Sequence, residues 1–564
     1  MSTSSPELIA TEQSADGVLL ASIDMPGRSM NVFSAALIDA LEAVIDRVED
    51  GSTIRGVVIT SGKSSFLAGA DLPMVRGMTE LAKTASREQM FAHCGRIGRL
   101  FQRIEQCSKP WVAAVNGTAL GGGLELAMAC RARVIDIQCK ALIGLPEVKL
   151  GLLPGAGGTQ RLPRFVGLDL GLDLLLSGRS LNPAEAVQAG LFEACPANTL
   201  LADAARARLN ALMLEGPSYQ TPKFPNLNMP SMEDCEASVL TLAERHGISS
   251  EALAQYPAYR AIIRSVLTGT RLALPAACDA EMTRFLDLMF SPVADHMITT
   301  LFIERQRVEK AVQLIATTLP RQVRNGPLSA KTSDWQNLFT QCGITLLADA
   351  NLEADVIELD DTAYTSPVRF NLCEVQNQKD SIQDDTISGQ EHFPCLVLSR
   401  SSEHGRVIEC LLPQVITSWT PSQYTAIQGA LASLAKKTKC FLFFTNAPSC
   451  SATQSLLLAM QHAKAIGGAA NSTGEHDKTA PRSPLNGMAL AAAQALEEGR
   501  VSDPGIIDVA AVLAGIAPAY SGGPISYALS HYEALNPALV SRLGASYDSF
   551  KHKLQAYQAS KRSH

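Results

Sequence analysis

Two glutamates in apolar surroundings are the residues of this chain best suited to chemistry. Glu125 lies between two leucines, and Glu147 lies in the run GLPEVKLGLLP formed by residues 144–154. A charge among apolar neighbours costs free energy unless it is paired. Two semi-buried acids that face one cleft can divide general acid and general base work between them. The spacing leaves an alternative open, in which each acid pairs with a surface lysine or arginine, such as Lys149 for Glu147.

Two glycine-rich segments could bring backbone amides to these acids. Residues 65–71 read SFLAGAD, and residues 116–125 read NGTALGGGLE and lead into helical text. Glycines where a strand turns into a helix let the backbone approach a ligand, and the start of a helix offers free N–H groups at a positive dipole end. This pattern favours an oxyanion site, although tight packing explains such glycines equally well.

The elements that must position these residues alternate between strands and helices. Short apolar runs predict buried strands at Val18–Ile23, residues 56–60 and Trp111–Val115. Between the first two runs, apolar residues recur at helical spacing behind Ser34, a favourable N-cap; they are Leu37, Leu41, Val44, Ile45 and Val48. This order predicts an α/β or layered α+β domain rather than an all-β one.

The chain is long enough for several domains, and two segments interrupt its pattern. Residues 216–230 contain four prolines, which predicts an extended boundary loop. Residues 374–391 offer almost nothing to bury, which favours a linker. Helical patterning is expected over residues 251–314, and again over residues 421–435 and 485–498.

Composition excludes several classes of protein. Of the 564 residues, 46% are hydrophobic and 18% are charged, which is not the composition of a disordered chain. The net charge of −7 gives no general attraction to nucleic acid or to an anionic membrane surface. No signal peptide and no membrane span are expected. The 13 cysteines include no C-x-x-C pair, which predicts reduced thiols rather than a metal site.

Five segments together resemble the crotonase family, the enoyl-CoA hydratase/isomerase superfamily. They are MNVF at residues 30–33, FLAGAD at residues 66–71, AVNGTALGGGLELA at residues 114–127, GLPEVKLGLLPGAGGTQRL at residues 144–162 and LSGRSLNPAEA at residues 176–186. The resemblance is greatest to the hydratase part of the multifunctional α-chain of fatty-acid β-oxidation. It implies an α/β fold class, in which a crotonase-type β-β-α spiral precedes a helical linker and a mostly α, dehydrogenase-like C-terminal region.

The resemblance also implies roles for four residues. Ala70 and Gly122 match the two residues whose backbone N–H groups hold the thioester oxygen. Glu125 and Glu147 match the two acids of hydratases, and Glu147 is the expected proton donor. Many relatives that isomerise, hydrolyse or decarboxylate acyl-CoAs lack one or both acids. Their joint presence therefore favours the addition of water.

The adenine end of CoA is assigned by the same resemblance to the loop that holds Ala68, Asp71 and Leu72, through backbone groups. Arg28, beside the first glycine-rich segment, is a candidate for the 3′-phosphate, but a solvated surface charge explains it better. The resemblance implies no metal and no redox cofactor.

After the linker, the chain departs from the multifunctional relatives. Residues 256–310 resemble the linker that joins hydratase to 3-hydroxyacyl-CoA dehydrogenase, yet no G-x-G-x-x-G turn follows it. Residues 407–439 resemble the dehydrogenase sequence that follows its catalytic histidine. An aliphatic residue stands near the position of that histidine, and His392 and His404 do not match it. The second half is therefore expected to be a degenerate dehydrogenase without NAD chemistry.

The expected domains are a crotonase-like hydratase domain at residues 1–205, a helical linker region at residues 206–318, a remnant of a dinucleotide-binding-like domain with a polar linker at residues 319–395, and a degenerate dehydrogenase-like helical domain at residues 396–564. The leading hypothesis for function is a cytoplasmic enoyl-CoA hydratase. The alternatives are a Δ3-Δ2-enoyl-CoA isomerase and a non-catalytic acyl-CoA-binding scaffold. The expected partners are an acyl-CoA substrate and, as a candidate, a thiolase subunit, and the expected assembly is a monomer or a small homo-oligomer.

Overall fold

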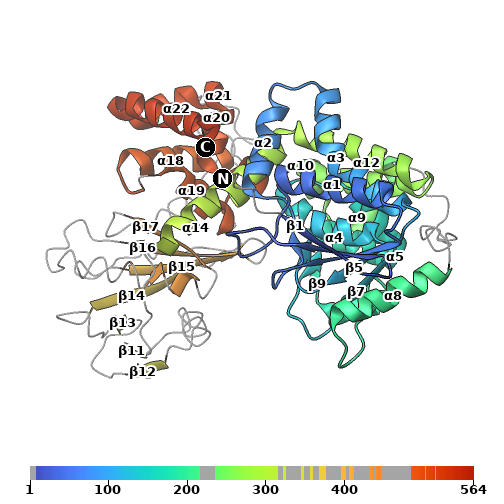
Figure 1. The fold of residues 1–564 in the computed structure, drawn as a ribbon. Coiled ribbons are helices and arrows are strands. Elements are labelled where there is room, and N and C mark those ends of the chain that lie inside the picture. The colour runs from blue at the N-terminus through green and yellow to red at the C-terminus, as the bar shows by residue number, and fades with distance from the viewer. Residues whose placement is uncertain are drawn as a thin grey trace, which may run out of the picture. The chain divides into compact units, whose positions relative to one another are not determined.

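A computed structural model of the chain contains two compact units, residues 1–295 and 296–564 (Figure 1). The structure describes residues 8–215, 235–314, 322–325, 345–348, 356–359, 368–375, 395–401, 405–411, 428, 431–432, 434–436, 440–445, 484–501, 503–514 and 516–563. The expected boundary loop at residues 216–230 lies outside these ranges. So do His392, His404 and all but the first two residues of the expected linker at residues 374–391.

A six-stranded sheet in the order β1-β2-β3-β5-β7-β10 forms the base of the first unit. Its strands are β1 (Ile9–Gln13), β2 (Val18–Ile23), β3 (Gly56–Ser61), β5 (Trp111–Val115), β7 (Ala132–Ile135) and β10 (Glu193–Ala194). β1 is antiparallel to β2, and the other neighbours are parallel. The three strands expected from apolar runs are confirmed as β2, β3 and β5, because parallel strands that are buried on both faces read as continuous apolar text.

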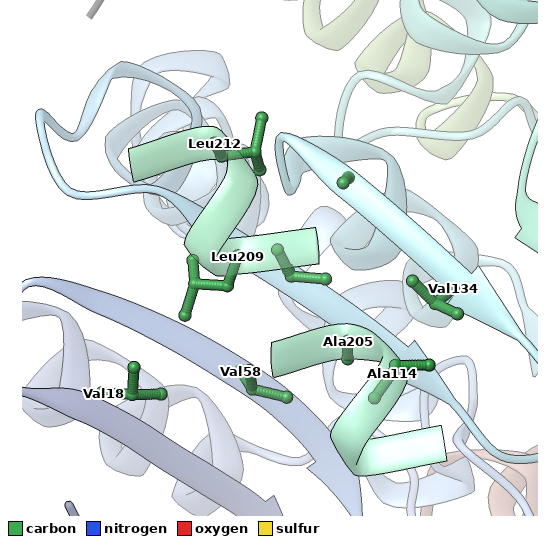
Figure 2. Packing of buried hydrophobic residues seen from close by; sticks show 10 residues of the cluster. Val18, Val58, Ala114, Val134, Ala205, Leu209 and Leu212 are labelled. Atoms are coloured by element: carbon green, nitrogen blue, oxygen red, sulfur yellow. The ribbon is translucent and has the colours of Figure 1, made fainter. Parts of the chain in front are cut away.

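Helix α8 (Leu201–Glu215) covers part of this sheet, as Figure 2 shows. Its buried residues Ala204, Ala205, Leu209 and Leu212 pack on Val18, Val58, Val112, Ala114, Ala132 and Val134 of the strands. The expected limit of the first domain at residue 205 falls inside this helix. The domain limits themselves stay predictions.

The expected helix behind Ser34 is confirmed as α1 (Ala35–Asp50), and the Ser34 side chain accepts a hydrogen bond from the backbone N–H of Leu37. The five apolar residues that predicted this helix are all buried. The α-helices between α1 and α8 are α2 (Leu72–Ala82), α3 (Arg87–Gln106), α4 (Gly122–Ala129), α5 (Gly158–Val166), α6 (Leu168–Ser177) and α7 (Pro183–Gln188).

A second, small sheet joins the turns that follow the long strands. It contains β4 (Leu67–Ala68), β6 (Ala119–Leu120), β8 (Ile143–Gly144) and β9 (Ser180–Leu181), in that order. The chain therefore repeats one unit of two strands and a helix: β3-β4-α2, then β5-β6-α4, then β7-β8 and the 3₁₀-helix η1 (Glu147–Leu150). These repeats confirm the expected α/β spiral.

Linker helices complete the first unit. They are α9 (Glu236–Arg245), α10 (Ser250–Gln255), α11 (Pro257–Gly269) and α12 (Leu274–Met289), followed by α13 (Pro292–Met297) at the limit of the unit. α11 contacts α5 and α6, and α12 contacts α3 and α5. The helical patterning expected from residue 251 onward is confirmed, and these helices lie against the elements that carry the candidate site.

The second unit contains a seven-stranded mixed sheet in the order β12-β11-β13-β14-β15-β16-β17. The strands are β11 (Gln322–Asn325), β12 (Thr345–Ala348), β13 (Val356–Leu359), β14 (Val368–Val375), β15 (Cys395–Ser401), β16 (Gly405–Leu411) and β17 (Phe441–Thr445). The sheet thus extends beyond residue 395, where the helical domain is expected to begin.

Helices make up most of the rest of the described residues in the second unit. They are η2 (Ile298–Glu304), α14 (Arg305–Leu314), α18 (Pro484–Glu497), α19 (Pro504–Leu513), η4 (Ala519–Ser521), α20 (Pro524–Ser530), α21 (Tyr532–Leu543), η5 (Gly544–Ser546) and α22 (Tyr547–Ser563). The mostly α C-terminal region and its helix at residues 485–498 are confirmed. The expected helix at residues 421–435 lies largely outside the described residues.

Within the described ranges, no single helix has both the length and the apolar character to cross a membrane. Two consecutive helices, Leu274–Met289 and residues 292–310, reach those limits only when they are taken together across a sharp bend.

Candidate active site

Three of the expected site residues follow the ends of strands in the small sheet. β4 pairs in parallel with β6, and β6 pairs in parallel with β8. Ala70, Gly122 and Glu147 come two or three residues after the last residues of these strands. Since the carboxyl ends of parallel strands share one edge of a sheet, the strand pairing brings these three residues together.

Consecutive glycines separate the two acids. The point at which a Cβ atom would stand on Gly121 lies 2.7 Å from Oε1 of Glu147, and the same point on Gly122 lies 3.9 Å from Oε2 of Glu125. Gly121 also has a φ of 54°, a conformation that favours glycine. The glycine-rich segment at residues 116–125, which predicted a close backbone approach, therefore leaves room for two carboxyl groups beside the start of α4.

The backbone N–H groups of Ala70 and Gly122 donate no hydrogen bond within the β-bridge and the helix that contain them. Phe33 forms a parallel bridge with Ala70 in which Phe33 donates to Gly69 O at 2.7 Å, and Asp71 donates to Phe33 O at 2.9 Å. The N–H of Ala70 takes no part in this bridge. Gly122 is the first residue of α4, whose first N–H groups have no partner within the helix. Both amides suit an oxygen ligand, and their role stays a prediction.

Glu125 is a buried acid held by backbone amides. Its side chain is 3% exposed, and its Oε1 accepts hydrogen bonds from the N–H groups of Ala156 and Gly158, each at 2.8 Å. Burial raises the pKa of this carboxyl, while the two amides and the nearby Arg161 oppose the rise. Hydrogen bonds from N–H donors stabilise the ionised form.

Glu147 has a different environment. It is half-buried at the start of η1, and its Oε2 is closed off from solvent and has no hydrogen-bond partner among the described residues. Burial, followed by the negative charge of Glu125, raises the pKa of Glu147 well above its ordinary value. The alternative pairing with Lys149 does not form: Lys149 is exposed, and within the described part of the chain no ion pair joins the two residues.

A third buried acid was not among the residues expected from the sequence. Glu281 on α12 is 0% exposed and accepts hydrogen bonds from the N–H groups of Gly157 at 2.6 Å and Thr159 at 2.8 Å. Burial, together with the charge of Glu125, raises the pKa of Glu281 to about 8. The sequence contains a signal for it: Glu281 lies four residues before Phe285, so an acid stands among the apolar residues on the buried face of the helix.

The residues expected at CoA have the following places. Asp71 is the N-cap of α2, accepting from the N–H of Met74 at 2.9 Å, and it forms an ion pair with Arg28 at 3.0 Å. Ala68 ends β4 and donates its N–H to Asn31 at 3.0 Å. Leu72 begins α2, and its side chain lies outside the described part of the structure. The carboxylate of Asp71 thus orders the loop, and the contact with CoA stays a prediction.

Comparisons with known proteins identify relatives of this chain. Residues 14–238 match the family model described as enoyl-CoA hydratase/isomerase. Fatty acid oxidation complex subunit alpha of Idiomarina loihiensis is 36% identical over 296 residues, which are 52% of this chain and 40% of that protein. The protein of the same name from Shewanella halifaxensis is 33% identical over 316 residues, which are 53% of this chain and 43% of that protein.

A solved structure of an enoyl-CoA hydratase from Bacillus anthracis covers 54% of this chain and 96% of its own chain, at 24% identity and a TM-score of 0.33. The aligned part of this chain spans about two fifths of the length of the two curated relatives. The family match at residues 14–238 lies within the first unit, which carries Glu125, Glu147 and Glu281.

Proposed function

We propose that residues 14–238, which match the enoyl-CoA hydratase/isomerase family model, form a crotonase-family domain that adds water to a 2-enoyl-CoA thioester. The product is the 3-hydroxyacyl-CoA. The observation that carries the proposal is the difference between Glu125, which accepts two backbone N–H hydrogen bonds that favour its ionised form, and Glu147, whose buried oxygen has no partner among the described residues. Two carboxyl groups whose pKa values are separated by their environments suit one base and one acid.

The amides of Ala70 and Gly122 would polarise the substrate. Two N–H groups on the thioester oxygen draw electrons from the conjugated double bond and make Cβ electrophilic. Removing one such donor from an oxyanion site in other enzymes costs roughly 10²–10³ in kcat. The half-exposed position of both residues beside the strand ends supports this role.

The two acids would then complete the addition. Ionised Glu125 takes a proton from water while the water oxygen bonds to Cβ. The electron pair of the double bond moves to Cα, where it takes the proton of Glu147. The hydroxyl group of water is then bonded to Cβ, and its other proton is on Glu125. Cα carries the proton that Glu147 has given up, so Glu147 is ionised. One proton moves from Glu125 to Glu147 before the next turnover.

Two other functions compete with hydration. A Δ3-Δ2-enoyl-CoA isomerase moves a proton between carbons and has no use for a second acid that activates water. A non-catalytic acyl-CoA-binding scaffold would not require the separation of two buried carboxyl groups. The pair Glu125 and Glu147 therefore favours hydration over both.

The proposal extends to the rest of the protein. The missing G-x-G-x-x-G text supports a second unit without NAD chemistry, and no step of the hydration needs a metal or a redox cofactor. The names of the relatives, which are subunits of a complex, support a partner subunit, for which a thiolase is the candidate. We place the protein in the cytoplasm.

A panel of 2-enoyl-CoA thioesters of several chain lengths tests the proposal, with the loss of the absorbance of the conjugated thioester as the readout. Turnover without added metal or NAD is expected, and NAD is not reduced when it is added. Turnover of only a 3-enoyl-CoA would identify an isomerase. Tight binding of acyl-CoA without any turnover would identify a scaffold.

A further inference from the structure

Four consecutive amides bind alternately to two carboxyl groups. The N–H groups of Ala156 and Gly158 donate to Glu125, and those of Gly157 and Thr159 donate to Glu281. The hydroxyl of Thr159 also donates to Glu281. The segment at residues 155–159 is thus held from two sides, by an acid of α4 and by an acid of α12.

The second of these acids comes from outside the family domain. The family match ends at residue 238, whereas Glu281 lies on the linker helix α12. Its two oxygens accept three hydrogen bonds, so neither the carboxyl group nor residues 155–159 can move without breaking buried contacts. Ser265 of α11 supports the same segment, because its hydroxyl bonds that of Thr159 at 2.8 Å.

We propose that Glu281 is a positioning residue for the hydration: it fixes residues 155–159 so that their amides hold Glu125 in the orientation that activates water. This inference rests on the proposed function. Glu281 reaches the reaction only through the segment and Glu125. The linker helix is therefore part of the catalytic arrangement and does more than connect two units.

Several charged or titratable groups surround this arrangement. The charge of Glu125 of α4 raises the pKa of Glu147 of η1 and of Glu281 of α12, and the charge of Glu281 also raises the pKa of Glu147. On α5, Arg161 lowers the pKa of both Glu125 and Glu281, and it is paired with Glu105 of α3 at 3.1 Å. Cys278 of α12 also faces Arg161, and burial raises the pKa of its thiol to about 12.

The test compares Glu281→Gln with Glu281→Ala, and uses Asp279→Asn as the control. Asp279 is an exposed acid of the same helix, two residues away, so its variant makes the same replacement of a carboxyl by an amide without touching residues 155–159. Glutamine keeps one acceptor oxygen for the segment, whereas alanine keeps none. We expect kcat to fall about 10- to 100-fold in Glu281→Gln and further in Glu281→Ala, with KM within about threefold of wild type. Asp279→Asn stays at the wild-type rate.

The pH profile separates positioning of the acids from a general loss of structure. When Glu281 is ionised, its charge raises the pKa of Glu147. Glu281→Gln removes that charge, so the basic limb of the kcat profile moves to lower pH. A variant that is merely less well folded would lower kcat without moving the limb.

Hydrogen exchange of residues 155–159 in the full chain gives a readout that does not depend on turnover. Exchange is expected to be slowest in wild type and in Asp279→Asn, faster in Glu281→Gln, and at least about tenfold faster in Glu281→Ala. If Glu281→Gln matches wild type in kcat, pH profile and exchange, the proposal is wrong. If wild type does not hydrate any enoyl-CoA, the proposed function fails and the catalytic part of this inference fails with it, and the exchange data still decide whether Glu281 holds the segment.

Discussion

Glu125 and Glu147 lie in different environments, because backbone amides bind Glu125 while Oε2 of Glu147 has no hydrogen-bond partner among the described residues, and the proposed hydration uses this contrast. Both were identified from apolar neighbours in the text, since a carboxyl group among leucines needs either a partner or a function. The difference between their hydrogen-bond environments could not be predicted in that way. It depends on the N–H groups of Ala156 and Gly158, which reach Glu125 only after the chain has folded.

Glu281 marks the limit of prediction from single residues. Helical patterning is predictable over residues 251–314, and Glu281 lies on the buried face of one of these helices, four residues before Phe285. No local sequence pattern predicts that this acid accepts hydrogen bonds from residues 157 and 159, because a long-range contact cannot be inferred from the sequence of either segment alone.

The first prediction concerns the proton donor. Glu147→Gln cannot deliver a proton to Cα, so kcat should fall by about 10²–10⁴, the usual contribution of general acid–base catalysis, with little change in KM. Steady-state hydration kinetics measure this. Glu244→Gln, an exposed acid of α9, is the matched control and should retain wild-type kinetics. A Glu147→Gln enzyme with more than a tenth of wild-type kcat would contradict the assignment.

The second prediction is the shape of the pH profile of kcat/KM. The base must be ionised, so activity is lost as pH falls through the pKa of Glu125, which is above its ordinary value. The acid must be protonated, so activity is lost as pH rises through the pKa of Glu147, which is raised further. A bell-shaped profile is expected, with its maximum above the ordinary pKa range of glutamate. A profile that is flat from pH 5 to pH 9 would exclude a pair of buried acids.

At the scale of elements, three short parallel strands bring the site together. β4, β6 and β8 have two residues each, and strands this short cannot be predicted from the periodicity of apolar residues. The long strands β2, β3 and β5 and the helix α1 were predictable, because each buries a continuous or regularly spaced apolar set. The glycine-rich sequence therefore predicted turns. The small sheet that aligns three such turns could be seen only in the structure.

Gly121→Ala provides a third prediction. A Cβ atom at this residue would lie 2.7 Å from Oε1 of Glu147, and the φ of 54° is unfavourable for alanine. Glu147 must move, and we expect a loss of about 10²-fold in kcat from misplacement on the order of 1 Å. Gly247→Ala is the control, because Gly247 also has a positive φ but has no atom within 4 Å of the Cβ position. Equal kinetics in the two variants would show that Gly121 serves only the backbone.

A fourth prediction concerns the packing of α8 on the sheet. Leu209 is 0% exposed in this contact, so Leu209→Ala should destabilise the first unit by about 2–5 kcal/mol. Leu214 of the same helix is 89% exposed, and Leu214→Ala should change the free energy of unfolding by less than about 0.5 kcal/mol. Chemical denaturation followed by circular dichroism compares the two. A similar, small effect of both variants would mean that α8 is not part of this core.

At the scale of the whole molecule, the fold class and the helical C-terminal region were predictable, and the sheet of the second unit was not. The resemblance to the crotonase family is specific because its five segments are the turns and helix starts that form the spiral. In the second unit, the apolar runs that become the seven-stranded sheet are separated by text without a recognisable motif. That unit has its own buried centre: Asp508 of α19 accepts from the N–H of Ile525 at 2.7 Å and from the hydroxyl of Ser526 at 2.6 Å.

The dependence of the first unit on its linker helices leads to the last prediction. Gln160 and Arg164 of α5 are buried, and they donate to the backbone oxygens of Ser265 and Gly269 on α11, each at 3.0 Å. A chain that ends at residue 238, where the family match ends, would leave these groups and the apolar residues beneath α11 and α12 exposed.

A chain that ends at residue 295 keeps both helices, so it should unfold cooperatively and hydrate enoyl-CoA at a rate within about threefold of the full chain. The chain of 238 residues should lose most of its activity and bind a dye for exposed apolar surface. Thermal unfolding and hydration assays on both chains measure this. Full activity in the shorter chain would mean that α11 and α12 act only as a connection, because the buried donors of α5 would then be satisfied without them.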